Sequence, residues 1–255
     1  MSGPDRRREI ADYVLERGEV RIDELVSQFG VSRMTIHRHV EELARQGMLR
    51  KLHGAVSAQP SSIYESLYRF RETCAAEAKH AIAVAATGMI DPGQVILIDD
   101  STTARALGPL LAAAKPLTVV TNSLGLADAI AGRDGIRLIM LGGDYHPTYD
   151  AFIGHLTETS LAGLRVNTLF CGASAISGTS ALIQEAAVVR VKIAMMAAAS
   201  RAVLLADSSK FGKVALHLLA DLGRFDAVIT DEGLPVATRA TLVAAGVRLR
   251  IAPTP

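Results

Sequence analysis

Apolar residues in the first 57 positions recur at helical spacing in three short segments. The first segment, 6–17, ends before Gly18, a residue that suits the left-handed conformation at a helix C-terminus. The second begins at Asp23, a predicted N-cap, and ends before Gly30 after barely two turns. The pattern therefore predicts two short helices in front of a third.

The third segment has Ile36, Val40 and Leu43 on one helical face, with Ser32 as its predicted N-cap. Only Gly30-Val31-Ser32 separates it from the second segment. A tight turn with a glycine between two short helices is typical of a helix-turn-helix. With the apolar face buried, the residues turned outward are Met34, Arg38, Glu41 and Arg45, flanked by Arg33 and Thr35.

A basic segment follows the third predicted helix. Residues 48–56 predict two short strands around a basic tip, a wing whose charges would lie along DNA phosphates. Side chains near the start of the preceding helix can reach base edges. We therefore expect this part of the chain to bind double-stranded DNA. The candidate contact residues are Ser32, Arg33, Thr35, His37 and Arg38 on the helix, and Arg50, Lys51 and His53 on the wing.

In the rest of the chain, short apolar runs alternate with longer helical stretches. The runs lie at 95–98, 117–120, 136–141, 168–171, 202–206, 227–229 and 247–251. The helical stretches lie at 79–89, 104–114, 124–131, 185–200 and 237–245. This alternation predicts an α/β domain with a mostly parallel sheet covered by helices on both faces.

The composition changes near residue 58, where a charged, helix-forming segment gives way to one rich in Ala, Val, Leu and Ile. At this point Gln59-Pro60-Ser61-Ser62 has the composition of a loop. We expect a winged helix-turn-helix domain at 1–57, a connector at 58–78 and an α/β domain at 79–255.

Polar residues and glycines follow five of the predicted strands, and ligands of parallel sheets bind outside the carboxyl ends of the strands. The run 101–103 also precedes a helix, where backbone N–H groups, hydroxyls and the helix dipole favour an anion. Lys210 could supply a countercharge. We expect a phosphate or carboxylate site at this edge. Its candidate residues are Asp99, Ser101, Thr102, Thr103, Thr121, Asn122, Ser123, Gly142, Gly143 and Lys210.

Several polar residues also have purely structural interpretations. Asp99 and Asp100 end a strand, where an aspartate often serves as a cap. His146 and His155 flank a Tyr/Pro loop and are expected to be polar loop residues. His217 is expected on the surface of a helix.

Composition narrows the class of protein further. Hydrophobic residues make up 49% and charged residues 21%, as in ordinary globular proteins, and 27 Lys and Arg balance 26 Asp and Glu. Only local clustering therefore indicates a polyanionic partner. No apolar run reaches the about 18–20 residues of a membrane helix, so we expect a cytoplasmic protein without a membrane partner. Cys74 and Cys171 lie far apart and are expected to be core residues, with no metal site and no cofactor.

Residues 8–55 contain the motifs Glu24-Leu25, Phe29-Gly30-Val31-Ser32, Thr35-Ile36, Leu43 and His53-Gly54-Ala55. In these motifs the segment resembles the N-terminal winged helix of the DeoR family of bacterial transcriptional regulators. Members commonly carry Thr-Ile-Arg-Arg-Asp-Leu where this chain has Thr35-Ile36-His37-Arg38-His39-Val40. The departure bears on the operator sequence and on the pH and salt sensitivity of binding.

Further motifs extend this resemblance over nearly the whole chain. They are Lys79, Ile98-Asp99, Thr102-Thr103, Thr121-Asn122-Ser123-Leu124, Leu141-Gly142-Gly143, Phe152-Ile153-Gly154, Glu185-Ala186 and Asp207-Ser208-Ser209-Lys210-Phe211-Gly212. They resemble the effector domain of DeoR regulators, a domain similar in fold to pentose-phosphate isomerases. The resemblance implies that these segments, Glu185 included, form a site for a phosphorylated sugar or a related sugar-catabolism intermediate. Ser101 stands where the family usually has glycine, and Ala175-Ile176-Ser177 where it usually has Gly-Ile-Asp, which bears on the identity of the effector.

The sequence therefore predicts a transcriptional regulator and not an enzyme. Its expected role is that of a repressor of carbohydrate-utilisation genes. A homo-oligomer, dimer or tetramer, is expected because one short recognition helix reads few base pairs. Two alternatives stay open. One is a sugar-phosphate isomerase with an appended DNA-binding domain, which would use Asp99, Asp100, Glu185 and Lys210 as acid-base groups. The other is a nucleic-acid-binding structural protein with a vestigial second domain.

Overall fold

The computed structural model of the 255-residue chain describes residues 3–45, 49–57, 71–72 and 74–253. The chain divides into two compact units, Met1–Leu67 (unit 1) and Tyr68–Pro255 (unit 2). Most of the predicted connector, 58–78, lies outside the described residues. None of the described helices is long and apolar enough to cross a lipid bilayer.

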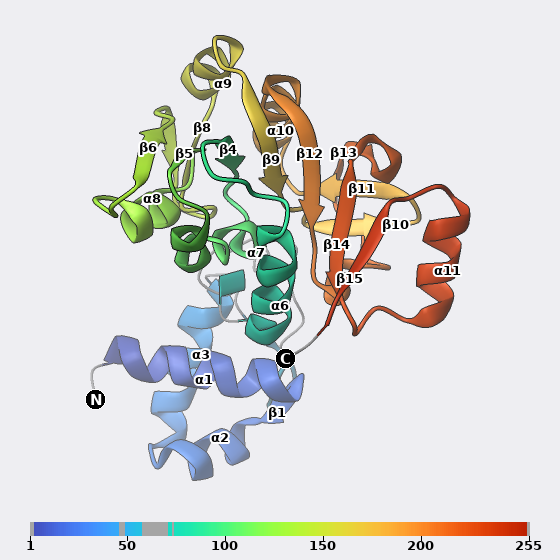
Figure 1. The fold of residues 1–255 in the computed structure, drawn as a ribbon. Helices are drawn as coiled ribbons and strands as arrows, with labels where there is room; N and C mark the ends of the chain where they lie inside the picture. Colours follow the sequence, from blue (N-terminus) through green and yellow to red (C-terminus); the bar gives the residue numbers. More distant parts are fainter. Residues whose placement is uncertain (1–2, 46–48, 58–70, 73, 254–255) are drawn as a thin grey trace. The chain divides into compact units, whose positions relative to one another are not determined.

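The described part of unit 1 is a helix-turn-helix with a small antiparallel sheet, as predicted. Its helices are α1 (Gly3–Arg17), α2 (Ile22–Phe29) and α3 (Arg33–Arg45) (Figure 1). Its strands are β1 (Glu19–Arg21), β2 (Arg50–Lys51) and β3 (Ala55–Ser57), in the order β1-β3-β2. The core of the unit includes the fully buried side chains of Ile10, Val14, Leu25, Ile36 and Val40. The predicted inward face of the third helix is thereby confirmed.

Asp23 does not cap α2, contrary to the sequence prediction. Strand β1 runs directly into the helix, so Arg21 takes the N-cap position and Asp23 lies in the first turn. There its carboxylate lies near the positive end of the helix dipole, and its Oδ1 is 3.2 Å from Arg33 Nη1. Gly30 ends the helix in the left-handed conformation, with a φ of 61°, as expected.

Unit 2 is built on a seven-stranded parallel sheet in the order β15-β14-β12-β9-β4-β5-β6. All seven predicted strands are present. They are β4 (Val95–Ile98), β5 (Leu117–Thr121), β6 (Ile136–Met140), β9 (Val166–Cys171), β12 (Ala199–Leu205), β14 (Ala227–Asp231) and β15 (Leu249–Ala252). The α/β class with a parallel sheet is therefore confirmed.

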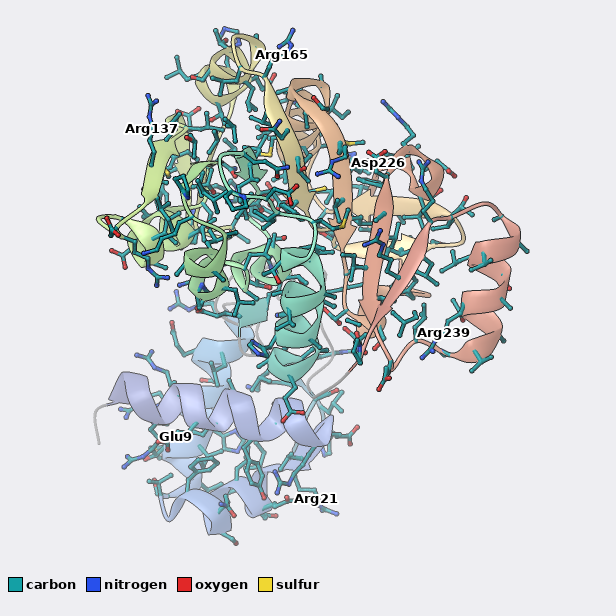
Figure 2. All side chains as sticks on the ribbon, in the orientation of Figure 1. Glu9, Arg21, Arg137, Arg165, Asp226 and Arg239 are labelled. Carbon is teal, nitrogen blue, oxygen red and sulfur yellow. The ribbon has the colours of Figure 1, made fainter. Side chains whose placement is uncertain are left out.

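Helices and apolar side chains cover both faces of this sheet (Figure 2). One face packs α6 (Ala76–Thr87), α7 (Thr102–Arg105), the 3-10 helix η1 (Gly108–Ala114) and α8 (Leu124–Ile130). The other face packs α9 (His155–Ala162) and α10 (Ala186–Ala198), and α11 (Val236–Ala244) lies near β15. Successive residues of a strand point to opposite faces of the sheet. In β4, Ile96 and Ile98 pack on the face covered by α6, α7, η1 and α8, and Leu97 packs on the face covered by α9 and α10.

The order of the strands creates a switch point in the middle of the sheet. The chain starts at β4, adds β5 and β6 on one side, and then returns to place β9 on the other side of β4. In open α/β sheets, ligands bind in the crevice at the carboxyl ends of the strands where the order reverses. The residues that follow β4 and β9 therefore occupy the expected place of a binding site.

Two antiparallel additions were not foreseen from the sequence. Strands β7 (Asp144–His146) and β8 (Ala151–Ile153) form a hairpin, and β10 (Ala175–Ser177), β11 (Ser180–Ile183) and β13 (His217–Asp221) form a small sheet.

The structure corrects the expected positions of three histidines. His217 lies on strand β13 and not on a helix, His146 ends β7, and His155 is the first residue of α9. The predicted helix 104–114 is split into α7 and η1, because Pro109 has no N–H to continue an α-helix.

Candidate functional site

The exposed face of α3 is the candidate DNA interface. Met34 is 81% exposed, and Arg33, Arg38, Glu41 and Arg45 are exposed around it, as the helical spacing predicted. Ser32 caps the helix: its Oγ accepts a hydrogen bond from Thr35 N (3.2 Å) and lies 2.9 Å from Thr35 Oγ1. Thr35 and His37 are half-buried beside these residues.

Acidic neighbours hold several of the basic side chains on this surface. Lys51 Nζ donates a hydrogen bond to Glu41 Oε1 (2.9 Å), and Arg33 pairs with Asp23. The bond and charge of Lys51 lower the pKa of the Glu41 carboxyl. Arg38 has no ion-pair partner among the residues that the structure describes.

The wing differs in detail from the expected one. Arg50 and Lys51 lie on strand β2, and exposed Leu52, His53 and Gly54 form the turn to β3. The positive charges therefore lie along the strand next to α3, and not at the tip.

His39 lies on the buried side of α3 and is 6% exposed. Burial lowers the pKa of its imidazole, and the positive charges of Arg38, Arg7 and Arg6 lower it further. His39 is therefore a core residue that favours its neutral form.

In unit 2 the switch point is bridged by Asp99, which follows β4 and is fully buried. Its Oδ1 accepts a hydrogen bond from Ser101 N and its Oδ2 one from Gly172 N, each at 2.9 Å. Gly172 follows β9, so one carboxylate joins the two strand ends that meet where the order reverses. Asp99 thus fixes the geometry of the site.

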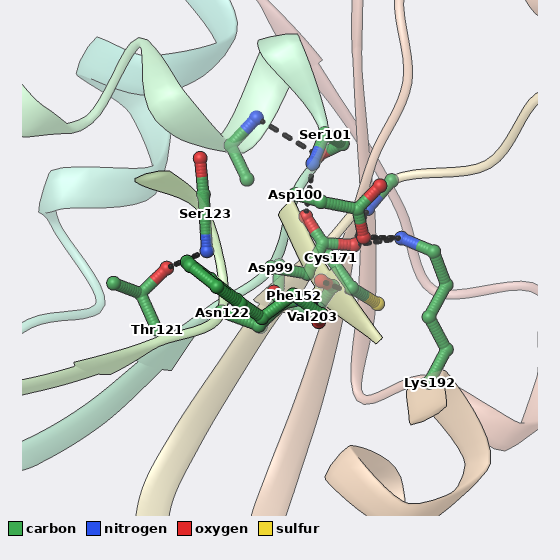
Figure 3. A network of polar contacts seen from close by, with 12 residues as sticks. Asp99, Asp100, Ser101, Thr121, Asn122, Ser123, Phe152, Cys171, Lys192 and Val203 are labelled. Atoms are coloured by element: carbon green, nitrogen blue, oxygen red, sulfur yellow. Dashed lines mark hydrogen bonds and ion pairs between the residues drawn. The ribbon is translucent and has the colours of Figure 1, made fainter. Parts of the chain in front are cut away.

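Lys192 pairs with both aspartates at this point (Figure 3). Its Nζ donates to Asp99 Oδ2 and lies 3.2 Å from Asp100 Oδ1. Burial lowers the pKa of Lys192, but Asp100 and Asp99 together outweigh burial and raise that pKa above its ordinary value. The sequence analysis missed this residue. The available signal was its position on the inward stripe of α10 with Val188 and Met195.

The predicted hydroxyl groups lie together at the strand ends, but most of them make local hydrogen bonds. Ser101 Oγ accepts from Ala104 N (3.2 Å), Ser123 Oγ from Leu126 N (3.3 Å), and Thr121 Oγ1 from Ser123 N (3.0 Å). Ser101 and Ser123 are therefore N-caps of α7 and α8. Thr102 Oγ1 donates to the Arg71 carbonyl (3.3 Å), and Thr103 is buried beside it.

The two predicted site glycines follow β6. Gly143 has a φ of 152°, and a Cβ there would lie 2.2 Å from Thr157 Oγ1 and 2.7 Å from the Ile153 carbonyl oxygen. Gly142 accepts a hydrogen bond from the same Thr157 hydroxyl (2.8 Å). Close packing of this loop on α9 and β8 explains the glycine at 143.

Two lysines lie near one another beyond β12. Lys210 is half-buried on the 3-10 helix η2 (Ser208–Lys210), whose N-cap is Asp207. Lys79 on α6 is 5% exposed, and its Nζ donates to the Arg71 carbonyl. Burial lowers the pKa of Lys79 to about 8; Asp207 opposes the shift and Lys210 adds to it. This end of the site is therefore positively charged.

Glu185 lies at the N-cap position of α10. Its Oε2 is 3.2 Å from His146 Nε2, and the His146 ring packs edge-on against the ring of Tyr149, with centroids 5.1 Å apart. Neither His146 nor Tyr149 was among the predicted site residues.

Two family models match the chain. The model described as the DeoR-like helix-turn-helix domain matches residues 6–61, and that of the DeoR C-terminal sensor domain matches residues 75–232.

Curated relatives match over almost the full length. The HTH-type transcriptional regulator YgbI of Escherichia coli (strain K12) is 32% identical, over 97% of this chain and 97% of its own. The glycerol-3-phosphate regulon repressor of the same strain is 30% identical, over 98% and 100%. The L-fucose operon activator of Haemophilus influenzae is 33% identical, over 89% and 91%.

Among solved structures, ribose 5-phosphate isomerase A from Neisseria gonorrhoeae matches with a TM-score of 0.35 and 19% identity, over 54% of this chain and 53% of that one. The translation initiation factor eIF-2B of Pyrococcus horikoshii matches with a TM-score of 0.44 and 15% identity, over 87% and 81%. The two matching domain models and the near full-length relatives show that the chain belongs to the DeoR family of DNA-binding transcriptional regulators.

Proposed function

We propose that this protein represses genes of carbohydrate use and that a phosphorylated sugar controls its affinity for operator DNA. The observation that carries the proposal is that one chain combines an exposed, largely basic face on α3 with a cluster of polar residues at the switch point of an α/β sheet. Two of the relatives support this proposal: one is a glycerol-3-phosphate regulon repressor and the other is an L-fucose operon activator.

On the DNA side, we assign base contacts to the start of α3 and phosphate contacts to the wing. Arg38 is exposed one turn into the helix, and Lys51 lies on the adjacent strand. The contact set comprises Ser32, Arg33, Thr35, His37, Arg38, Arg50, Lys51 and His53. Two or more copies of the chain are needed for useful affinity for DNA, so the protein acts as a homo-oligomer. We place this oligomer in the cytoplasm.

On the effector side, we assign the anionic group of the ligand to the end of the site near Lys210 and Lys79. Two cations lie near one another there, and a bound phosphate would relieve the repulsion between them. The remaining assigned residues are Asp99, Ser101, Thr102, Thr103, Thr121, Asn122, Ser123, Gly142, Gly143 and Glu185.

The ligand is bound and not turned over in this proposal. Isomerisation through an enediol needs a carboxylate base poised at the reacting carbon. Lys192 engages Asp99 and Asp100, and Glu185 lies against His146. These contacts support binding without catalysis. In this proposal, residues 58–78 connect the DNA-binding domain at 1–57 with the effector-sensing domain at 79–255.

The test measures DNA and effector binding by the full chain. Fluorescence anisotropy with operator DNA, isolated from the promoters next to the gene, is repeated with ribose 5-phosphate, glucose 6-phosphate, fructose 6-phosphate and glycerol 3-phosphate. At least one of these should weaken operator binding, and Lys210→Ala should weaken that ligand roughly ten- to 150-fold.

The matched control is Lys115→Ala, which removes an exposed lysine paired with Asp134 just before β5, at the opposite end of the strands. Its effector affinity should equal that of the wild type. Equal effector affinity in wild type and Lys210→Ala would contradict the assigned site. Operator binding that no sugar phosphate changes would contradict the regulatory proposal.

A further inference from the structure

Several buried polar atoms beside the switch point have no hydrogen-bond partner among the residues that the structure describes. They are Tyr149 Oη, Asn122 Oδ1, His146 Nδ1 and Asp100 Oδ1, of which the last meets only the charge of Lys192. Tyr149 and Asp100 are each 2% exposed, and Asn122 is fully buried. Buried polar groups are satisfied in the large majority of cases, so a local group of exceptions indicates a missing partner.

The hairpin β7–β8 brings these atoms to the site. Asn122 and Phe152 are joined twice: Phe152 N donates to the Asn122 carbonyl (2.9 Å), and Asn122 Nδ2 donates to the Phe152 carbonyl (3.0 Å). Leu124 N donates to the Asp150 carbonyl (2.9 Å), which fixes the turn that carries Tyr149 against the loop after β5. The hairpin is therefore anchored on residues already assigned to the site.

Tyr149 faces the polar interior of this region. The guanidinium carbon of Arg71 lies 5.3 Å from the centre of its ring, and the His146 ring packs on it edge-on. Burial raises the pKa of the Tyr149 hydroxyl, and the negative charges of Glu185 and Asp100 raise it further. The hydroxyl thus stays protonated and can both donate and accept a hydrogen bond.

We propose that Tyr149 Oη, Asn122 Oδ1 and Asp100 Oδ1 form a subsite for the hydroxyl groups on the carbon chain of the effector. This inference rests on the proposed function and adds to it the residues that distinguish a polyol chain from a bare phosphate. The anionic group lies at the Lys79 and Lys210 end, and the hydroxyl-bearing carbons reach the hairpin. Acceptors predominate in the subsite, which suits ligand O–H donors.

With such a subsite, loss of the Tyr149 hydroxyl should not lower the stability of the free protein but should weaken ligand binding. A tyrosine with a purely structural role would not show both effects. In the free protein its hydroxyl is buried without a described partner, so its removal costs no hydrogen bond and relieves a desolvation penalty. In the complex the same hydroxyl pairs with the ligand, and its removal weakens binding.

The experiment compares full-length wild type with Tyr149→Phe. Thermal unfolding is followed without ligand, and calorimetric titration uses inorganic phosphate and the four sugar phosphates of the operator experiment. We expect an equal or higher Tm for Tyr149→Phe, unchanged affinity for inorganic phosphate, and roughly five- to 100-fold weaker binding of the best sugar phosphate.

The matched control is Tyr145→Phe on the same hairpin. Tyr145 is 48% exposed and its hydroxyl donates to Asp150 Oδ1 (2.9 Å), so its loss should leave sugar-phosphate affinity within twofold of the wild type. A lower Tm for Tyr149→Phe, or unchanged sugar-phosphate affinity, would overturn the subsite and leave the proposed function standing. Failure of every sugar phosphate to bind the wild type would overturn both.

Discussion

His39 gives unit 1 a pH dependence that no surface histidine would give. Its pKa in the folded chain is lowered by burial and by the charges of Arg38, Arg7 and Arg6. Neutral His39 is therefore favoured by folding. Its contribution to stability is complete above the unfolded pKa of about 6.5 and is lost as the pH falls through the lowered folded value.

We predict that unit 1 loses stability as the pH falls below about 6.5, and that His39→Gln loses less stability over the same fall in pH. Thermal unfolding of the full chain, followed by hydrogen exchange at α1 and α3, measures this. The matched control is His37→Gln, which removes the less buried histidine of the same helix and should keep the wild-type pH dependence. An identical acid loss in His39→Gln would show that other groups cause it.

Lys192 stabilises the switch point by pairing with two buried aspartates. Removal of one partner from a buried charge pair leaves an uncompensated charge and costs about 3–5 kcal/mol. Lys192→Met keeps the length and apolar stem of the side chain but leaves Asp99 and Asp100 buried together. We predict a loss of about 3–5 kcal/mol in the free energy of unfolding of unit 2, measured by urea denaturation.

The exposed pair of Lys115 and Asp134 supplies the control, because Lys115→Met should change the same free energy by about 1 kcal/mol or less. A similar small change for Lys192→Met would mean that the aspartates are protonated or solvated in the folded protein.

For single residues, the sequence predicted which positions are buried better than it predicted which side chains contact one another. Spacing was sufficient to place Ile36, Val40 and Leu43 inward, since helical geometry alone decides it. It could not show that Lys192 meets Asp99, which lies 93 positions earlier, because only the packing of α10 on the sheet brings them together. Tyr149 was missed for the same reason.

Helix α3 and the wing are linked by an acidic residue whose charge should oppose the proposed binding of DNA to this surface. Glu41 is exposed on α3, and its carboxylate holds Lys51 of β2 at 2.9 Å. Phosphates approaching this surface must compete with that carboxylate for the lysine. We predict that Glu41→Gln tightens binding to operator and random DNA alike and makes the salt dependence steeper by about one unit.

The measurement is the operator and random-DNA affinity at several salt concentrations. Glu24→Gln is a useful control, because it also removes one exposed carboxylate of unit 1, but from α2, where Glu24 accepts from Tyr13 (3.0 Å). Weaker DNA binding by Glu41→Gln would show that Glu41 holds the wing in its binding position and does not compete with phosphates for Lys51.

Among whole elements, the parallel strands were predictable and the antiparallel additions were not. A strand buried on both faces contains an uninterrupted apolar run, as in β4 and the first three residues of β14. Strands β7, β8 and β10 have only three residues each, too few to show a period. The gathering of polar residues at the strand ends was predictable, whereas the hairpin β7–β8 beside them was not, and the anion site itself stays a prediction.

For the molecule as a whole, the proposed control of DNA binding has a thermodynamic requirement. If the effector changes operator affinity by some factor, operator DNA must change effector affinity by the same factor. We predict equal factors in calorimetric titrations of the full chain with effector, performed with and without saturating operator. Lys210→Ala, saturated with effector at a higher concentration, should show a similar factor if Lys210 contributes to binding only. Unequal factors in the wild type would indicate that a third equilibrium, such as assembly of subunits, takes part.

The order of the strands also affects how the chain is made. Of the seven strands of this sheet, β4 is synthesised first but lies in the interior of the sheet, and its second neighbour, β9, begins at Val166, about 70 positions after β4. Until the ribosome has released β9, a nascent sheet of β4, β5 and β6 presents one edge of β4, including Ile96 and Ile98, without a partner. Unpaired apolar edges of this kind recruit other chains, so chaperone dependence and loss to aggregation should be greatest when translation pauses before residue 166.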